Sequence, residues 1–471
     1  MLFNSLAFAL FLAVVFAIYW SVPIRRLQNV FLLVASYVFY GWWDWRYLSL
    51  IAGCSAINYL AGNIIGKSKN RWTRRIWLTV ACFTSLGTLA IFKYFNFFIC
   101  SFASMCELVG LCWSPWVLNL ALPVGISFFT FQAISYTIDI ALGKMKPANN
   151  WVEFFAFISF FPQLVAGPIE RASNLLPQFQ RSRVFDAEAA SHGLCLMAYG
   201  LFKKMVVADT LSLYVDNAFK NPGFYSSVTC LIGAIFFSLQ IYCDFSGYSD
   251  VARGVARLFG FELMLNFDRP YLSKTFGEFW RRWHISLSSW FKDYVYIPLG
   301  GNRVSFPKML RNLWIVFLLS GLWHGASWAF VLWGALHAFF LTLGAFRRKY
   351  CPRLSTSGSL AGIGAIILVD GGVVLAWVLF RAGTLDKASI YLKAMFACNF
   401  KTTLMSLCAG QGPMTFLFCC IAASLLLLSY VVPRDCKFTS WRSQFGFISL
   451  CIGAIVFFGM PSGGEFIYFQ F

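Results

Sequence analysis

Long apolar runs separated by short polar connections dominate this sequence. Runs close to the roughly 20 residues needed to cross the hydrocarbon core of a bilayer recur at about 1–20, 27–43, 47–65, 76–98, 117–141, 151–168, 225–245, 360–380, 414–432 and 444–460. A further run from Leu313 to Ala345 is longer than one crossing needs, so we expect it to tilt, break or contain a re-entrant piece. The pattern predicts an all-α chain with about eleven membrane crossings.

The middle of the chain has a different character, because residues 160–311 are richer in polar, charged, glycine and proline residues. Broken backbone of this kind cannot face lipid, so we expect it to be buried in protein or to lie at the interface. Within it, residues 276–291 show apolar positions at helical spacing, which predicts one helix with His284 on its apolar stripe. Pro298 and a Gly-Gly pair predict that this helix ends near Tyr294 to Ile297.

Composition agrees with a polytopic membrane protein that forms a single domain over residues 1–471. The chain is 59% hydrophobic and only 12% charged, with a mean hydropathy of +0.68. It carries 38 Lys and Arg against 19 Asp and Glu, a net charge of +19. The basic residues fall mostly in short connections such as 67–75 and 346–353, which is the positive-inside bias of cytoplasmic loops and argues against nucleic-acid binding. Placing Arg25 and Arg26 inside together with the loop 67–75 predicts an extracytoplasmic N-terminus, because two crossings separate these basic segments.

Two further features exclude other classes. The first apolar run is followed by the first basic residues, not preceded by them, so we interpret it as a retained span and not as a signal peptide. The 15 cysteines lack metal-type spacing and many lie within apolar runs, so we assign no zinc or redox site to them.

Four histidines are the main candidates for chemistry. His324, in SGLWHGASW, lies within an apolar run, where an ionisable side chain is by default a functional hypothesis. The surrounding small residues, including Ser320 and Ser327, would let a helix or a narrow substrate approach the backbone closely, although tight helix packing alone explains them as well. His337 lies thirteen residues further along and would face another side of one continuous helix, and burial alone does not choose between the two. His192 is interpreted as interfacial and structural.

A buried neutral histidine can accept a proton from a hydroxyl and return it to a leaving group, which suits acyl transfer to an alcohol. The motifs of serine hydrolases, P-loop nucleotidases and metalloproteases are absent from the sequence. Trp283 and Trp323 precede two of the histidines and are candidates for lining a tunnel, with packing an equal alternative. Asp244, Asp250 and Asn266 are expected to orient the centre or to hold a cytoplasmic loop. Arg281 and Arg282 are candidates for meeting a phosphate-bearing donor or, alternatively, anionic lipid.

In an ordered set of motifs the sequence resembles the membrane-bound O-acyltransferase (MBOAT) family, in particular the bacterial branch with alginate O-acetyltransferase and the D-alanyl-lipoteichoic acid acyltransferase. WRRWHISLSSWFKDYVYIPLGGNR carries His284, and WHGASW carries His324 forty residues later. The other matching motifs are QLVAGPIERA (163–172), YCDFSGYSDVARG (242–254), NFDRPYLSKTFGEFW (266–280) and FIYFQF (466–471). The resemblance covers nearly the whole chain.

The resemblance implies that His324 is the catalytic general base and that His284, at the second signature position, shapes the tunnel or assists the thioester carbonyl; His337 has no assigned role. It implies a ring of transmembrane helices, with interfacial and re-entrant helices, around a central tunnel, with the signature core at about 160–345.

The resemblance also implies the partners. The donor would be a cytoplasmic thioester, acetyl-CoA or an acyl carrier, with no bound cofactor or metal. The acceptor would be an exported polysaccharide or cell-wall polymer, reached through a separate extracytoplasmic partner protein at the bacterial inner membrane. D-alanyl transfer from a carrier protein to teichoic acid is the main alternative. A transporter that uses buried histidines is the alternative from another class, and the absence of internal repeats counts against it.

Overall fold

The computed structural model describes residues 1–165, 167–351, 359–400, 403–429, 440–460 and 466–467, together with Val432, Cys436 and Phe438. Over these residues the chain forms helices joined by turns and loops, without a β-strand. The chain divides into two compact units, residues 1–197 with 251–264 and residues 198–250 with 265–471. The predicted all-α class is confirmed for the described residues.

The first unit is built from helices of the N-terminal part of the chain. They are α1 (Leu6–Ser21), α2 (Arg25–Asp44), η1 (Trp45–Tyr47), α3 (Leu48–Lys67), α4 (Arg71–Leu89), η2 (Ala90–Tyr94), α5 (Phe95–Leu108), α6 (Ile126–Ala141), α7 (Trp151–Ser159), α8 (Phe161–Leu164), α9 (Ala172–Gln180) and most of α10 (Ala187–Phe202). Helix α3 packs against α4, α6 and α7, and α6 is buried over nearly its whole length, including polar side chains such as Gln132 and Thr137.

A buried polar network joins three helices of the first unit. Asn58 of α3 donates from Nδ2 to Ser85 Oγ of α4 at 2.9 Å, and its Oδ1 accepts from Thr137 Oγ1 of α6 at 2.7 Å. Because each polar atom in this network finds a partner on a neighbouring helix, the contacts fix which helix faces meet.

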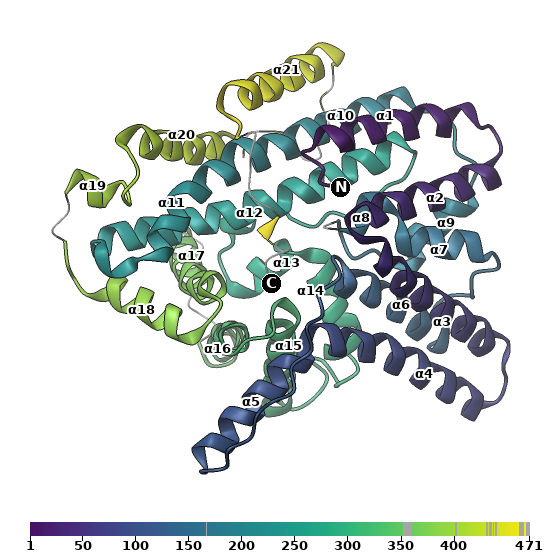
Figure 1. The fold of residues 1–471 in the computed structure, drawn as a ribbon, viewed down its shortest axis with the longest axis horizontal. Helices are drawn as coiled ribbons and strands as arrows, with labels where there is room; N and C mark the ends of the chain where they lie inside the picture. The colour runs from purple at the N-terminus through teal and green to yellow at the C-terminus, as the bar shows by residue number, and fades with distance from the viewer. Residues whose placement is uncertain are drawn as a thin grey trace. The chain divides into compact units, whose positions relative to one another are not determined.

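The second unit contains the remaining helices. They are η3 (Lys203–Ala208), α11 (Asp209–Lys220), η4 (Pro222–Phe224), α12 (Ser227–Leu258, shared with the first unit), η5 (Pro270–Leu272), α13 (Phe276–Arg282), α14 (Ile285–Phe291), η6 (Lys292–Tyr296), α15 (Phe306–His324), α16 (Trp328–Tyr350), α17 (Ser359–Ala382), α18 (Leu385–Phe396), α19 (Leu404–Leu407), α20 (Pro413–Ser429) and α21 (Trp441–Phe458). Helices α15 and α16 lie side by side, as Figure 1 shows, and α16 packs in turn against α17.

Six helical segments of the described residues are long and apolar enough to cross a membrane. They are 25–67, 71–108, 227–258, 328–350, 360–382 and 441–458, with shorter apolar helices at Leu6–Ser21 and Pro413–Leu426. Two of the predicted crossings are wrong, because neither run forms one helix over its predicted length. The run 117–141 is helical only from Ile126, because Pro123 and the left-handed Gly125 precede it. The run 151–168 is divided at Phe160 into α7 and α8, and most of its apolar side chains are buried in contacts with other parts of the protein.

The long run from Leu313 to Ala345 contains a break, which was one of the three predicted alternatives. Helix α15 ends at His324, and α16 begins at Trp328 after the extended Gly325 and Ser327. The two helices meet at glycines: a Cβ placed on Gly321 would lie 2.3 Å from the Phe330 carbonyl oxygen, and one on Gly334 would lie 2.2 Å from the Phe317 carbonyl oxygen. The small side chains therefore let the two backbones touch.

The single helix predicted over residues 276–291 is wrong. Helix α13 ends at Arg282 and α14 begins at Ile285, with His284 in the left-handed region at φ 44°. The interruption is held by backbone pairing with a segment before η5, since Asp268 N–H donates to the Arg282 carbonyl and Ile285 N–H donates to the Asn266 carbonyl, both at 2.9 Å. Helical periodicity continued through the break, so the pattern did not reveal it. The predicted end of the helical region near Tyr294 to Ile297 is confirmed by η6.

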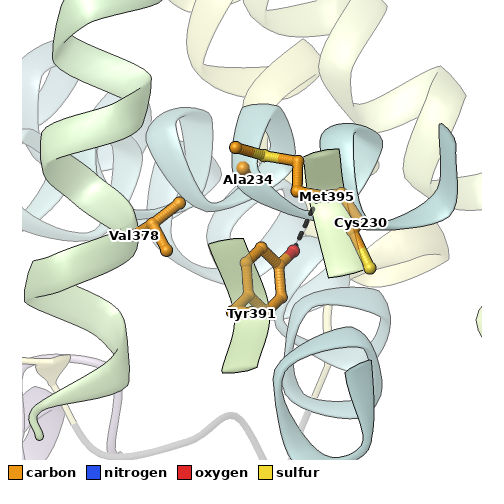
Figure 2. Close-up of a cluster of buried hydrophobic side chains, with 5 residues drawn as sticks. All are labelled: Cys230, Ala234, Val378, Tyr391 and Met395. Carbon is orange, nitrogen blue, oxygen red and sulfur yellow. Dashed lines mark hydrogen bonds between the residues drawn. The ribbon is translucent and has the colours of Figure 1, made fainter. Parts of the chain in front are cut away.

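A buried cluster holds α12, α17 and α18 together within the second unit. Figure 2 shows Tyr391 of α18 pointing at α12, where its hydroxyl donates to the Cys230 carbonyl at 2.7 Å. Ala234, Val378 and Met395 complete the cluster and are almost fully buried. These contacts fix the distances between the three helices.

Candidate functional site

Three histidines of the second unit lie along one cluster of aromatic rings. The ring centroids of His284 and Trp323 are 5.9 Å apart, and those of Trp323 and His324 are 4.9 Å apart. His324 is 4.8 Å from Trp333, which in turn is 4.7 Å from His337. All five side chains are buried. The fold thus brings the loop between α13 and α14 next to the ends of α15 and α16.

His324 is the last residue of α15, directly before the break. Its ring contacts Trp333 of α16 and also Phe380 of α17, at 5.4 Å between centroids. The predicted neighbours Ser320 and Ser327 are both close in sequence but differ in role, because Ser320 is buried in α15 whereas the Ser327 hydroxyl donates to the Gly383 carbonyl at 2.7 Å. His324 therefore lies where three helices converge, at the last residue before the helical backbone ends.

The glycines around His324 serve helix packing, which was one of the two readings of the sequence. A Cβ on Gly325 would lie 2.2 Å from the Phe330 ring, and Gly321 faces the α16 backbone. No space for a substrate is needed to explain these glycines. Their effect on His324 is indirect: they press α16 against α15 and so bring Trp333 onto the imidazole.

His284 is held by an unusually well-defined set of partners. Asn266 Oδ1 accepts from the Ser286 N–H at 3.2 Å and from the Ser286 hydroxyl at 2.9 Å, and it lies 3.1 Å from His284 Nδ1. A backbone N–H can only donate, so the Asn266 atom here must be oxygen, and His284 Nδ1 must carry a proton. Because burial lowers the pKa of His284 to about 3, the ring is neutral and Nε2 is left with its lone pair.

This tautomer has a chemical consequence. A neutral ring whose proton is on Nδ1 can accept a hydrogen bond at Nε2 but cannot donate one there. Assistance to a thioester carbonyl would need a donor, whereas orienting a hydroxyl or shaping a tunnel would not. The geometry of Asn266 therefore favours a role of His284 in shaping the tunnel over one in assisting the thioester carbonyl.

A second layer supports His284 from α12. Asn266 Nδ2 donates to Ser249 Oγ at 3.3 Å, and the Phe245 ring packs edge-on against the His284 ring at 4.6 Å. Phe466 lies on Phe245 at 5.6 Å and on Tyr248 at 4.4 Å. Of the C-terminal motif FIYFQF, residues 466 and 467 are described and 468–471 lie outside the described residues.

Asp244 anchors this second layer. Its Oδ2 accepts from the Ile467 N–H at 2.8 Å, and its Oδ1 lies 2.7 Å from Lys204 Nζ. Lys204 also pairs with Asp209 at 2.9 Å, and all three charged side chains are buried. Asp244 thus holds the C-terminal segment in place and contacts no histidine directly.

The tryptophans predicted to line a tunnel fall into two different surroundings. Trp323 contacts His284 and His324 and separates the two imidazoles. Trp283 instead packs on Phe279 at 5.5 Å and on Trp377 at 4.9 Å, and only 1% of its surface is exposed. Trp323 is therefore part of the histidine cluster, while Trp283 packs on residues next to the cluster.

The two arginines are not part of the cluster. Arg281 is exposed, and Arg282 pairs with Glu278 one helical turn away at 2.7 Å. Asp250 is likewise outside the cluster, because it accepts a short hydrogen bond from Lys203 Nζ at 2.5 Å. Among the described residues, no group of three or more His, Cys, Asp or Glu side chains is arranged to hold a metal ion.

His337 occupies the far end of the aromatic cluster. Trp280 Nε1 donates to its Nδ1 at 3.3 Å, and Nε2 has no hydrogen-bond partner in the described part of the chain. The ring is fully buried between Trp280 of α13 and Trp333 of α16. A histidine that accepts a hydrogen bond inside a packed core has a sufficient structural role.

Sequence reasoning missed several residues of the site. Trp333 and Phe380 contact His324, Phe245 contacts His284, and Lys204 balances the charge of Asp244. Only Lys204 left a signal, since a lysine pair between apolar segments in LFKKMVVAD is costly to bury without acidic partners. Aromatic residues are too frequent, at 19% of the chain, to single out the ones that touch a histidine.

Comparison with known proteins gives matches over most of the chain. The sequence pattern of MBOAT, the membrane-bound O-acyltransferase family, matches residues 147–359. A probable alginate O-acetylase of Azotobacter vinelandii is 39% identical over 438 residues, which cover 92% of this chain and 84% of that protein. A peptidoglycan O-acetyltransferase of Helicobacter pylori is 35% identical over 400 residues, 79% of this chain and 74% of that protein. A teichoic acid D-alanyltransferase of Bacillus subtilis is 28% identical over 246 residues, 49% of this chain and 61% of that protein.

Proposed function

Because this chain belongs to the membrane-bound O-acyltransferase family, we propose that it transfers an acetyl group from a thioester donor to hydroxyl groups of an exported polysaccharide or cell-wall polymer. The resemblance inferred from the motifs is confirmed, as is O-acyl transfer as the class of reaction. The choice of acetyl is supported by the longer similarity to an alginate O-acetylase and a peptidoglycan O-acetyltransferase than to a D-alanyltransferase.

The observation that carries the proposal is the position of His324. It ends α15 at a break in the helix, buried among Trp323, Trp333 and Phe380, and it shares the Trp323 ring with His284. A general base needs a lone pair that can reach a hydroxyl in a site from which bulk water is excluded.

In the proposed reaction, a His324 ring nitrogen accepts the proton of the acceptor hydroxyl as the oxygen attacks the thioester carbonyl carbon. The new C–O bond forms and the carbonyl π electrons move to oxygen, giving a tetrahedral intermediate. Its collapse breaks the C–S bond, and the departing sulfur takes the proton from the His324 imidazolium. The products are an O-acetyl ester and a free thiol, and His324 is returned to its neutral form. A base of this kind typically contributes about 10²- to 10⁴-fold in rate.

His284 acts as a positioning residue in this proposal. With Nδ1 donating to Asn266, its Nε2 can accept a hydrogen bond from a second hydroxyl of the acceptor or from a water, and can hold the acceptor in line with His324. Trp323 between the two rings keeps their separation fixed and excludes water.

The arrangement of entrances is part of the proposal as well. A ring of transmembrane helices would surround a tunnel, with the thioester entering from the cytoplasm and the acceptor from the outer side of the bacterial inner membrane. The N-terminus would be extracytoplasmic, and a separate extracytoplasmic protein would receive or deliver the acetyl group.

Labelled donors test the proposal on purified protein in liposomes. Acetyl-CoA with a labelled acetyl group is compared with a carrier protein charged with labelled D-alanine, using alginate oligosaccharides and peptidoglycan fragments as acceptors. We expect ester-linked acetyl label on one of these acceptors and none from the D-alanyl carrier. Transfer from the D-alanyl carrier alone would replace acetyl by D-alanyl. Thiol release without esterification of any glycan, even when a periplasmic extract supplies the partner protein, would overturn the polymer as acceptor.

A further inference from the structure

A wide apolar groove lies on the second unit, away from the three histidines. It has a volume of about 1030 Å³ and is lined by α12, η5, α17, α18 and α20. Its walls include Leu231 and Ile235 of α12 and Ile367 and Leu375 of α17. The cluster in Figure 2 fixes these helices, and Met395 belongs both to that cluster and to the groove. The groove is therefore preformed.

One carboxyl group interrupts this apolar surface. Asp370 lines the groove, and its Oδ1 is buried without a hydrogen-bond partner among the described residues. By contrast, the other polar groups of the groove are paired, because Ser238 Oγ donates to the Ala234 carbonyl and Tyr271 OH donates to the Ser238 carbonyl. An acidic side chain within an apolar span is costly unless a partner is supplied.

The depth of Asp370 restricts what that partner is. Asp370 lies near the middle of α17 (Ser359–Ala382), within the apolar segment 360–382. A helix of this length is about as long as the hydrocarbon core is thick, roughly 30 Å. Lipid headgroups lie at its two ends and their amines do not reach the middle, while lipid tails carry no polar group. Only a protein segment can carry a basic side chain to this depth.

The shape of α17 favours a helix as that segment. Gly364 and Gly371 are seven residues apart and so lie on one face, and a Cβ at either position would meet no atom within 4 Å. Ile367 between them is 66% exposed. Small residues on an open face allow the backbone of another helix to approach closely, which is how helices associate in a membrane.

We propose that this groove, centred on Asp370, is the docking site for a single transmembrane helix of a partner protein that carries a lysine or arginine near its middle. The charge pair would satisfy both ionisable groups, and the glycine face would receive the helix backbone. The proposal concerns assembly and is independent of which acyl group the enzyme transfers.

A synthetic peptide tests the proposal. The probe is a 23-residue Leu/Ala transmembrane peptide with one central lysine, labelled for energy transfer, and the control peptide has leucine in its place. Both are titrated against the purified full-length protein in liposomes. We expect the lysine peptide to bind the wild type at least about fivefold more tightly than the leucine peptide, and this difference to disappear in Asp370→Asn.

Two results would overturn the proposal: equal binding of the two peptides to the wild type, as expected of a groove filled by lipid, or a lysine preference that survives in Asp370→Asn. Gly371→Leu serves as a second variant, because Gly371 lines the groove and a Cβ there would meet no atom within 4 Å. It should abolish binding of the lysine peptide, and unchanged binding would place the site elsewhere. Monodispersity and the melting temperature of both variants show that the fold is kept.

Discussion

His324 and His337 contact the same indole ring, that of Trp333, at centroid distances of 4.8 and 4.7 Å. On one continuous helix, residues thirteen positions apart would face different sides. The break after His324 places them on two helices, so both reach the same core. Their surroundings still differ, since His324 ends a helix and His337 accepts a hydrogen bond from Trp280 inside one.

Replacing the proposed base should remove most of the activity. We expect His324→Ala to lower kcat for acetyl transfer by about 10²- to 10⁴-fold, because the acceptor hydroxyl then loses its proton acceptor. The donor KM should change little. Steady-state kinetics on purified protein measure both constants, with melting temperature as the control for folding. A kcat within a few-fold of the wild type would remove His324 from the mechanism.

The neighbouring histidine provides the matched comparison. His337→Ala should leave kcat per folded molecule close to the wild type but lower stability by about 1–3 kcal/mol, because the buried Trp280 N–H loses its acceptor. His337→Gln, which keeps an acceptor, should recover part of that loss. Thermal unfolding in detergent measures the stability of both variants. A loss of kcat as large as that of His324→Ala, at unchanged stability, would make His337 the catalytic residue.

The buried His284 should make stability depend on pH. Burial lowers its pKa to about 3 in the folded protein, against about 6.5 when unfolded. Between these values the unfolded state binds more protons, so the contribution of His284 is fully present above pH 6.5. It is lost progressively as pH falls toward 3, by up to about 1.4 kcal/mol per pH unit.

His284→Asn separates this effect from other titrating groups. Asparagine tolerates the left-handed backbone at this position (φ 44°) but does not titrate. The melting temperature of the variant should therefore fall less steeply between pH 6.5 and 4.5 than that of the wild type. Parallel pH profiles for the two proteins would show that His284 is not a buried neutral ring.

The glycine contact between α15 and α16 should be intolerant of even a methyl group. Gly334→Ala would place its Cβ 2.2 Å from the Phe317 carbonyl oxygen, so the helices must separate and Trp333 must move away from His324. We expect a stability loss of about 1–3 kcal/mol together with reduced kcat. Gly344→Ala on the same helix is the control, because its Cβ would meet only the Arg348 side chain at 3.6 Å. Equal behaviour of the two variants would contradict this packing.

The buried charge cluster of Lys204, Asp209 and Asp244 should need its lysine for stability. Lys204→Met leaves Asp244 and Asp209 buried without their cation and should cost about 3–5 kcal/mol. The same change at Lys220, an exposed residue at the end of α11, should have little effect. Denaturant or thermal unfolding measures both. Because Asp244 also binds the Ile467 N–H, we expect the C-terminal segment of Lys204→Met to become more sensitive to proteolysis.

Much of this protein could be predicted from local patterns. The share of apolar residues excluded a soluble fold, the length of the run 313–345 required a break or a tilt, and the cost of an ionisable group in such a run drew attention to His324 and His337 without choosing between them. Each of these inferences needs only one stretch of chain and the free energy of placing it in lipid. The same is true of the family, because its motifs are contiguous.

What the sequence could not determine depends on contacts between distant segments. Asn266 interrupts the helix at His284 from eighteen positions away, and Phe466 approaches the same histidine through Phe245. Asp370 gained significance only when its oxygen was seen to lie in an apolar groove. The sequence by itself determined the membrane class and, through its contiguous motifs, the family. Only the tertiary structure decided which side chains surround His324, because hydrogen bonds and ring contacts between remote residues leave no periodicity in the chain.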